Sequence, residues 1–108
     1  MVRRDWTAAR AKVDAEGQCR ICGSTQSVEA AHIIPRSLNG SKANMEPDGI
    51  VPCCRSCHTR VDAHQIPLSP HLSTNEQAHA VKMAGSILHA IRIMDGRSAV
   101  ADIVGDAA

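Results

Sequence analysis

Two Cys-x-x-Cys pairs constrain this chain more than any other feature of its sequence. Cys19 and Cys22 form the first pair, Cys54 and Cys57 form the second, and 31 residues separate the pairs. A two-residue spacer lets both thiolates of one turn point at a single ion, and two such turns complete the tetrahedron that zinc prefers. The spacing therefore predicts a structural zinc site that joins two distant parts of the chain.

The ligand set of this zinc site has alternatives. Cys53 lies four positions before Cys57, within the range of zinc-ligand spacings, so it can replace Cys54. We favour Cys54, because residues 49–53 then form a strand whose last residue is a small buried apolar one. His58 directly follows Cys57 and is a rival fourth ligand. Four buried free thiols with accidental spacing are the alternative to a metal site.

Composition also favours a metal-stabilised scaffold. The chain has 108 residues, enough for one small domain, and 44% of them are hydrophobic, but Trp6 is the only aromatic residue. An alanine-rich core buries little area per residue, so we do not expect apolar burial alone to hold this fold. A single tryptophan excludes an aromatic platform for stacking bases, and no glycine-rich phosphate-binding motif occurs.

Charge and hydropathy bear on partners and location. The formal net charge is +1, but residues 1–60 carry nine Lys/Arg against six Asp/Glu, and residues 61–108 carry three against five. A polyanion should therefore contact the first half of the chain. Neither a secretory signal nor a membrane span is evident, so we expect no membrane partner and a reducing cytoplasm. In that compartment paired cysteines bind metal more often than they form disulfides.

Residue patterns predict an α+β fold. Asp5 can cap a first helix, Gly17 can end it, and a capping box from Ser73 to Glu76 opens one long helix that runs to about Met94. The last dozen residues are alanine-rich, and we expect them to fray. The remaining expected elements are a helix over 6–16, strands over 27–34 and 49–52, a loop over 36–48, a helix within 54–63 and a linker over 65–73.

The middle of the chain resembles a known family. Cys-x-x-Cys is followed by Ala-His-Ile-Ile-Pro-Arg, a Gly/Asn loop and Ile-Val-Pro-Cys-Cys-Arg-Ser-Cys-His. This order resembles the HNH endonucleases, the ββα-metal nucleases, and is most similar to their small phage-type members. The resemblance covers about residues 19–64. It implies one HNH domain over 1–108, with a zinc-stapled ββα core and flanking N-terminal and C-terminal helices, the latter over about 74–94.

The resemblance also implies a function. His32 matches the family's general base, and His58 matches the ligand of a catalytic divalent cation such as Mg²⁺, Mn²⁺ or Ni²⁺. The implied reaction hydrolyses a DNA phosphodiester and leaves 5′-phosphate and 3′-hydroxyl ends. An unperturbed imidazole has a pKa of about 6.5, so a neutral histidine can take a proton from water. DNA is the implied partner, in a bacterial host cell, and phage-type relatives add a terminase or packaging protein, which would make the chain phage-encoded.

Three arginines are candidates for binding DNA phosphates. Arg36 follows the first expected strand, where it can hold a neighbouring phosphate by a bidentate contact. Arg55 and Arg60 are weaker candidates for the same task, because a solvated arginine explains each of them equally well.

The chain departs from the family pattern at two positions. Ala31 stands where many members have an acidic residue or a histidine that binds the metal. Gly49 stands where the middle asparagine is expected, and Asn39 and Asn44 are out of register. The missing ligand is the more serious departure, because one histidine holds a divalent ion weakly.

Asp62 is our candidate for the compensating ligand. It lies four residues after His58, one turn along the same face of a helix, and a His/Asp pair is a suitable site for a hard cation. Glu29 and Asp48 are less favoured helpers.

The leading interpretation is a metal-dependent DNA endonuclease of low sequence specificity, since no recognition helix is evident. A catalytically decayed zinc module that binds nucleic acid or a protein is the alternative, and a zinc-ribbon-like adaptor is a third. Among the other histidines we assign no function to His71, His79 and His89, and we leave His64 open.

Overall fold

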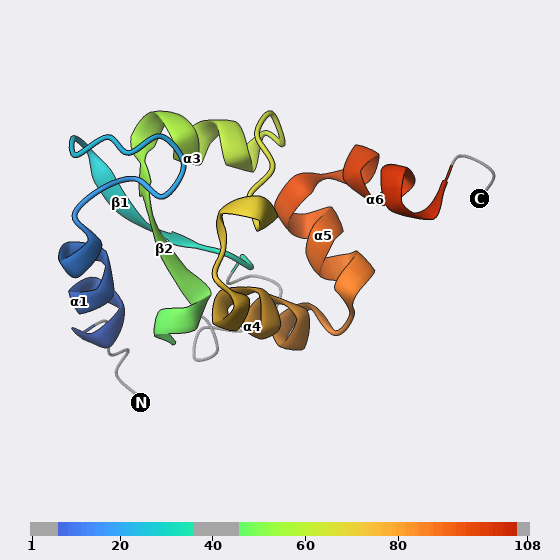
Figure 1. Ribbon diagram of the computed structural model, residues 1–108, viewed down its shortest axis with the longest axis horizontal. Coiled ribbons are helices and arrows are strands. Elements are labelled where there is room, and N and C mark those ends of the chain that lie inside the picture. Colours follow the sequence, from blue (N-terminus) through green and yellow to red (C-terminus); the bar gives the residue numbers. More distant parts are fainter. Residues whose placement is uncertain (1–6, 36–45, 106–108) are drawn as a thin grey trace.

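The structure is a computed structural model that describes residues 7–35 and 46–105. In the described chain, two strands and five α-helices form the expected α+β fold, with a helix before the hairpin and helices after it (Figure 1). The elements are α1 (Thr7–Glu16), β1 (Val28–His32), β2 (Ile50–Cys54), α3 (Arg55–Asp62), α4 (Thr74–Ala84), α5 (Ile87–Asp95) and α6 (Arg97–Val104), with 3-10 turns η2 (Pro47–Gly49) and η3 (Ser69–His71).

The two strands pair as an antiparallel hairpin in which Val28 is opposite Cys54 and His32 is opposite Ile50. The first strand is shorter than predicted at its end, where only the Ile33 amide continues the ladder by donating to the Gly49 carbonyl at 2.9 Å. The second strand begins one residue late and runs two residues further than predicted, so both Cys53 and Cys54 belong to it. The strand therefore delivers Cys54 directly to the start of α3.

Helix α1 covers one face of this hairpin. Ala9 and Val13 of α1 are buried against Ile50, with Val28 and Ala30 packed beside them. Gly17 adopts a left-handed conformation (φ 67°) after the last turn, as the sequence predicts. The expected helix start at Asp5 and Trp6 lies outside the described residues.

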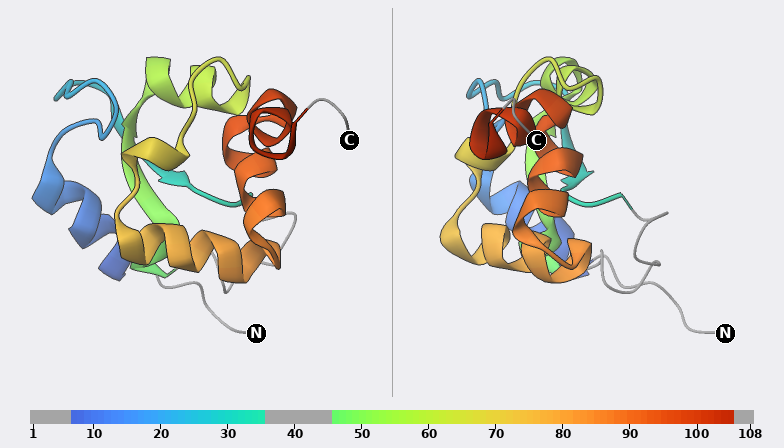
Figure 2. Two further views of the ribbon diagram at one scale, coloured as in Figure 1. Left: turned by 45° about the vertical axis from the view of Figure 1, so that its right-hand side comes forward. Right: turned by 90° about the vertical axis from the view of Figure 1, so that its right-hand side faces the viewer.

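The opposite face carries the main core. Ala31 and Val51 of the hairpin are buried there with Val61 of α3, Ala80 of α4 and Met94 of α5. Figure 2 shows α1 and α5 on opposite sides of the hairpin. The hairpin is thus sandwiched between α1 and the C-terminal helices, with α3 crossing one end.

The prediction of one long helix to about Met94 is wrong. The capping box is present at Ser73, but α4 ends at Ala84, because Gly85 takes a left-handed conformation (φ 94°). The Ser86 side chain then accepts a hydrogen bond from the His89 amide and begins α5. After this turn, α5 buries Ala90 and Met94 and leaves Leu88 exposed.

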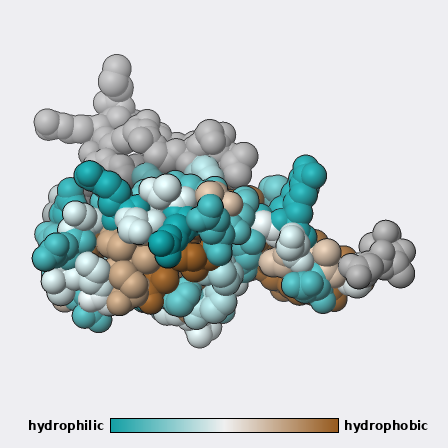
Figure 3. Space-filling model, turned by 90° about the horizontal axis from the view of Figure 1, so that it is seen from above, coloured by the Kyte–Doolittle hydropathy of each residue, from teal (hydrophilic) through white to brown (hydrophobic). Residues whose placement is uncertain are grey.

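Of the last dozen residues, which we expect to fray, Arg97–Val104 form helix α6 instead, and residues 106–108 lie outside the described residues. This helix starts after Gly96 and contains no buried residue, and Ile103 and Val104 are exposed on it. Figure 3 shows apolar side chains gathered on this projecting part of the molecule. Within the described chain no helix is both long enough and apolar enough to cross a bilayer.

A buried carboxylate links the N-terminal and C-terminal halves. Glu76 is 1% exposed, and it accepts hydrogen bonds from Lys12 Nζ at 2.5 Å, Arg20 Nη1 at 2.6 Å and the Ser73 amide at 2.7 Å. Burial raises the pKa of Glu76, but the hydrogen bonds from Arg20 and Lys12 outweigh it and lower the pKa to about 2. The carboxylate is therefore ionised and joins α1, the first cysteine turn and α4.

Candidate active site

The four predicted cysteine ligands gather at one place in the fold. The sulfur atoms of Cys19, Cys22, Cys54 and Cys57 all lie within 4.8 Å of one another. The Sγ atoms of Cys22 and Cys54 are 3.7 Å apart. A zinc ion with Zn–S bonds of about 2.3 Å has a tetrahedral edge of about 3.8 Å, so the donor set fits zinc in both chemistry and size.

Backbone hydrogen bonds hold these sulfur atoms in place. The Ile21 amide donates to Cys19 Sγ at 3.4 Å, and the Cys57 amide donates to Cys54 Sγ at 3.5 Å. Such N–H groups favour thiolates, which are the form that binds metal. The Arg20 amide donates to the Pro52 carbonyl at 2.9 Å and so fastens the first turn to β2.

The pKa values of Cys19 and Cys57 are shifted in opposite directions. Burial raises the pKa of Cys19, but amide hydrogen bonds from Cys22 and its neighbours lower it to about 6. Burial and the adjoining thiols raise the pKa of Cys57. Several sulfur atoms in so small a volume cannot all be ionised by themselves, and a divalent cation removes that conflict.

Cys53 stands outside this group. Its thiol is buried in the core opposite Glu29 in the register, and burial raises its pKa to about 12. A thiol of that kind behaves as a small apolar residue. The fold therefore assembles Cys54, not Cys53, with the other three cysteines.

His58 lies beside the cysteine site and faces a different environment. It is the next residue after Cys57 on α3, and one residue turns a helix by about 100°. Its Nδ1 is 3.0 Å from Glu29 Oε1, and its Nε2 is 3.6 Å from Asp62 Oδ2. The half-exposed imidazole therefore lies between two carboxylates.

Glu29 is held by two partners. Its second oxygen, Oε2, accepts from Arg55 Nε at 3.3 Å while Oε1 contacts His58. These two contacts lower the pKa of Glu29, the His58 hydrogen bond contributing most. Asp48, the other helper considered from sequence, lies in η2 at the opposite end of β2 from α3.

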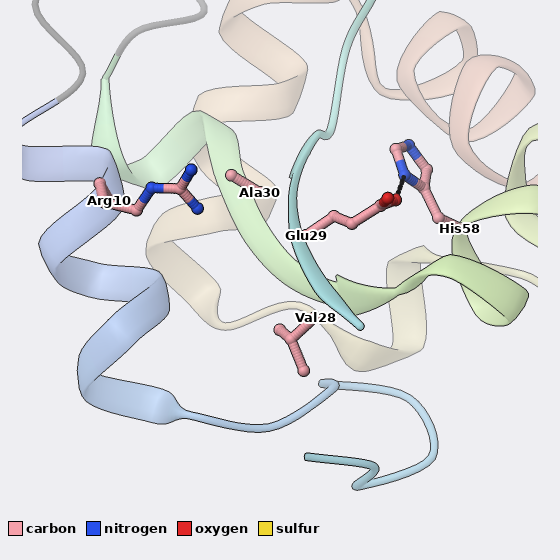
Figure 4. Close-up of a pocket in the computed structure, with 5 residues that line it drawn as sticks. All are labelled: Arg10, Val28, Glu29, Ala30 and His58. Carbon is pink, nitrogen blue, oxygen red and sulfur yellow. Dashed lines mark hydrogen bonds and ion pairs between the residues drawn. The ribbon is translucent and has the colours of Figure 1, made fainter. Parts of the chain in front are cut away.

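A cavity of about 670 Å³ opens beside His58 (Figure 4). Val28 and Ala30 line it from the face of β1 that packs on α1, and Glu29 lines it from the other face. The cavity therefore wraps the outer edge of β1. Arg10 of α1 forms its far wall, a residue that sequence reasoning missed because nothing local connects it with the cysteine turns.

His32 ends β1 and is half-buried, with its Nε2 atom inside the protein. Directly paired residues project to the same face of a sheet, and its partner Ile50 packs on α1. The His32 side chain therefore leaves β1 on the α1 side, the side of Val28 and Ala30. It is not among the described residues that line the cavity at His58.

The three arginines predicted to bind DNA phosphates do not lie together among the described residues. Arg55 and Arg60 line a second cavity, of about 690 Å³, at the start of α3, together with hydroxyl and amide side chains that include Ser24 and Gln26. No acidic residue is among its described lining. Arg36 lies outside the described residues. His64, left open above, contacts the Ile93 carbonyl through Nε2 at 2.9 Å and joins α3 to α5.

A hairpin followed by a helix, with four cysteines placed to bind a metal, defines a ββα-metal domain. Residues 19–63 match the family model described as HNH endonuclease, so this segment carries an HNH domain. The matched segment contains the four cysteines, His32, His58 and Asp62. No curated protein and no solved structure matches the chain.

Proposed function

We propose that this protein is a metal-dependent endonuclease that hydrolyses phosphodiester bonds of DNA with low sequence specificity. One observation carries the proposal: in an HNH domain, His58 lines a cavity on the edge of β1 and lies 3.6 Å from the Asp62 carboxylate. Sequence specificity should be low because none of the described helices is long and basic enough to read a groove by itself.

His58 and Asp62 fit a divalent cation. Their facing donor atoms are 3.6 Å apart, which allows both to bind one ion at about 2.1 Å. Imidazole and carboxylate suit cations such as Mn²⁺, and the exposed position leaves room for water and a phosphate oxygen. A bound cation would supply the positive charge that stabilises the phosphate and the leaving oxygen. Asp62 would thus replace the ligand that Ala31 cannot provide.

His32 is our candidate for the general base. The cavity wraps the edge of β1, so a phosphate at that edge can contact side chains from both faces of the strand. His32 is two residues beyond Ala30 on the same face. In the proposed step its imidazole takes a proton from water as the water oxygen bonds to phosphorus, the P–O3′ bond breaks, and the leaving 3′ oxygen takes a proton from solvent water. The products are a 5′-phosphate and a 3′-hydroxyl.

Arginines on both sides of His58 support a polyanionic substrate. Arg10 lines the far wall of the first cavity, and Arg55 and Arg60 line the second. We assign backbone phosphates to them, since guanidinium groups bind phosphate oxygens without reading sequence. DNA is the proposed partner; a terminase or packaging partner and a bacterial cytoplasmic location stay predictions from the resemblance alone.

A nicking assay on supercoiled plasmid tests the proposal. Wild-type protein with Mg²⁺, Mn²⁺ or Ni²⁺ should nick the plasmid, and His32→Ala should abolish nicking without changing the zinc content. His79→Ala is a matched control on α4. Nicking that survives in His32→Ala would remove the general-base assignment.

A decayed module that binds nucleic acid is the second candidate. Two observations favour it: Ala31 is buried where relatives carry a ligand, and His32 does not line the cavity at His58. DNA binding without cleavage, by wild type and by His32→Ala alike, would select this function over the nuclease.

A further inference from the structure

Glu29 contacts two side chains of α3 at once. One carboxylate oxygen faces His58 Nδ1 at 3.0 Å, and the other accepts from Arg55 Nε at 3.3 Å. Figure 4 shows the Glu29 side chain reaching from β1 toward the His58 ring. Glu29 is the second residue of β1, where it pairs with Cys53, the neighbour of a metal-site cysteine. The backbone that carries Glu29 is therefore fixed relative to α3.

We propose that Glu29 is a positioning residue for the cation site: it fixes His58 as the tautomer with hydrogen on Nδ1 and so presents the Nε2 lone pair toward Asp62. The inference rests on the proposed cation site at His58 and Asp62.

Donor and acceptor chemistry leads to this tautomer. An ionised carboxylate only accepts hydrogen bonds, so the 3.0 Å contact requires hydrogen on Nδ1. In a neutral imidazole the other nitrogen then carries a lone pair. That lone pair faces the Asp62 carboxylate at 3.6 Å, and two electron-pair donors at that distance are stabilised by a cation between them.

The same geometry argues against Glu29 as a direct ligand. It contacts one ring nitrogen and Asp62 contacts the other, so the two carboxylates do not converge on one point. Among the described residues, only the four cysteines bring three or more ligand atoms within 4.8 Å. Arg55 further restrains the Glu29 carboxylate by binding its second oxygen. A carboxylate behind a metal-binding histidine orients the ring and raises its basicity.

Nitrogen NMR of the His58 ring tests the tautomer directly. The zinc-loaded full chain is measured at pH 8 for wild type, Glu29→Gln, Glu29→Ala and Asp62→Asn. We expect hydrogen on Nδ1 in wild type and in Glu29→Gln, because the amide oxygen also accepts from Nδ1. Glu29→Ala should shift the ring toward the tautomer with hydrogen on Nε2. Glu46→Ala, at an exposed glutamate away from the hairpin ladder, is the control.

Calorimetric titration with Mn²⁺ tests the consequence. Glu29→Ala should weaken Mn²⁺ binding by about 10–100-fold, the usual cost of removing such a partner, and Glu29→Gln should restore most of the affinity. Asp62→Asn should weaken binding at least as much as Glu29→Ala. Zinc content and circular dichroism of each variant establish that the scaffold is intact.

Three outcomes would overturn the inference. One is a wild-type His58 with hydrogen on Nε2, and another is wild type that binds no Mn²⁺. The third is an equal decrease in affinity in Glu29→Gln and Glu29→Ala with none in Asp62→Asn, which would make Glu29 a ligand. If the tautomer and the Mn²⁺ affinities behave as expected but no plasmid is nicked, the proposed nuclease function fails and the role of Glu29 stands.

Discussion

Two neighbouring residues of α3, Cys57 and His58, belong to sites of opposite character. Cys57 is buried with three other cysteines, and the four sulfur atoms lie within 4.8 Å of one another. His58 is half-exposed, lies between two carboxylates and borders a cavity. A turn of about 100° between adjacent helical residues is enough to separate the two environments.

This difference indicates that the cysteine site stabilises the fold and that the site at His58 is open to a substrate. Four thiolates leave a zinc ion no open position, and such closed sites are structural. A histidine and an aspartate leave most positions around a cation open to water and phosphate, as a catalytic site requires. The comparison predicts that damage at the first site unfolds the protein, whereas damage at the second removes activity from a folded protein.

Removal of the zinc site should have the largest effect. Structural zinc contributes about 10–16 kcal/mol to small domains, which exceeds the roughly 5–15 kcal/mol stability of a typical one. Cys57→Ser should therefore be largely unfolded and lack stoichiometric zinc, measured by circular dichroism and metal analysis. Cys53→Ala is the matched control and should keep one zinc per chain. If Cys53→Ala lacked zinc while Cys57→Ser stayed folded and bound zinc, the assignment of Cys57 to the structural site would be wrong.

Substitution of His58 should show the opposite pattern. His58→Ala should reduce plasmid nicking by about 100-fold or more, since an ion that stabilises phosphate charge is worth several kcal/mol. Zinc content should stay the same, and the unfolding midpoint should change little, because the ring is half-exposed. His89→Ala, at an exposed position on α5, controls for removal of any histidine. A zinc-deficient His58→Ala would instead assign His58 to the structural site.

Glu76→Gln should cost stability but not function. We expect about 3 kcal/mol less free energy of unfolding at pH 7, because Lys12 loses its ionised partner and Arg20 keeps only the more exposed Glu16. Denaturant titration measures this decrease, and Mn²⁺ affinity at His58 should not change. A weakened Mn²⁺ affinity in a folded Glu76→Gln would show that the two regions are coupled.

The Glu76 carboxylate also determines the direction in which stability changes with pH. The folded pKa of Glu76 is lowered from its ordinary 4.5 to about 2. Its contribution is therefore complete above about pH 4.5 and decreases as the pH falls toward 2. Both proteins lose zinc in acid, so the difference in their free energies of unfolding reports the contribution of Glu76 alone. That difference should be constant from pH 7 to pH 5 and smaller at pH 4.

Arg60→Ala should have the smallest effect. Without this guanidinium the second cavity should bind one DNA phosphate fewer, which lowers the slope of log affinity against log salt by about 0.9. The affinity itself should decrease only modestly at any single salt concentration. Fluorescence anisotropy without added divalent cation measures the slope. Arg92→Ala, an exposed arginine on α5, should leave the slope unchanged. Equal slopes for wild type and Arg60→Ala would remove Arg60 from the DNA-binding surface.

Local patterns in the sequence predicted much of this fold. The end of α1 at Gly17, the capping box at Ser73 and the end of α5 before Gly96 each depend on neighbouring residues only. The break at Gly85 and Ser86 was also local, but apolar periodicity on both sides concealed it. Periodicity describes which face is apolar and does not register a left-handed turn that redirects the helix.

The candidate site was predictable only in part. Spacing alone put Asp62 next to His58, since residues four apart share a helix face. Glu29 ranked low because 28 residues separate it from His58, and Arg10 was not considered at all. Both reach the site through strand pairing and helix packing, which a reading of local spacing does not contain.

By itself, the sequence determined the four-cysteine metal site, the order of hairpin and helix, and the match of residues 19–63 to the HNH family model, because each of these depends on spacings of a few residues. The tertiary structure decided which of two adjacent cysteines joins the metal group and which carboxylate holds the His58 ring. Those choices depend on how β1, β2 and α3 pack, since a strand register fixes which side chains from distant segments share one face.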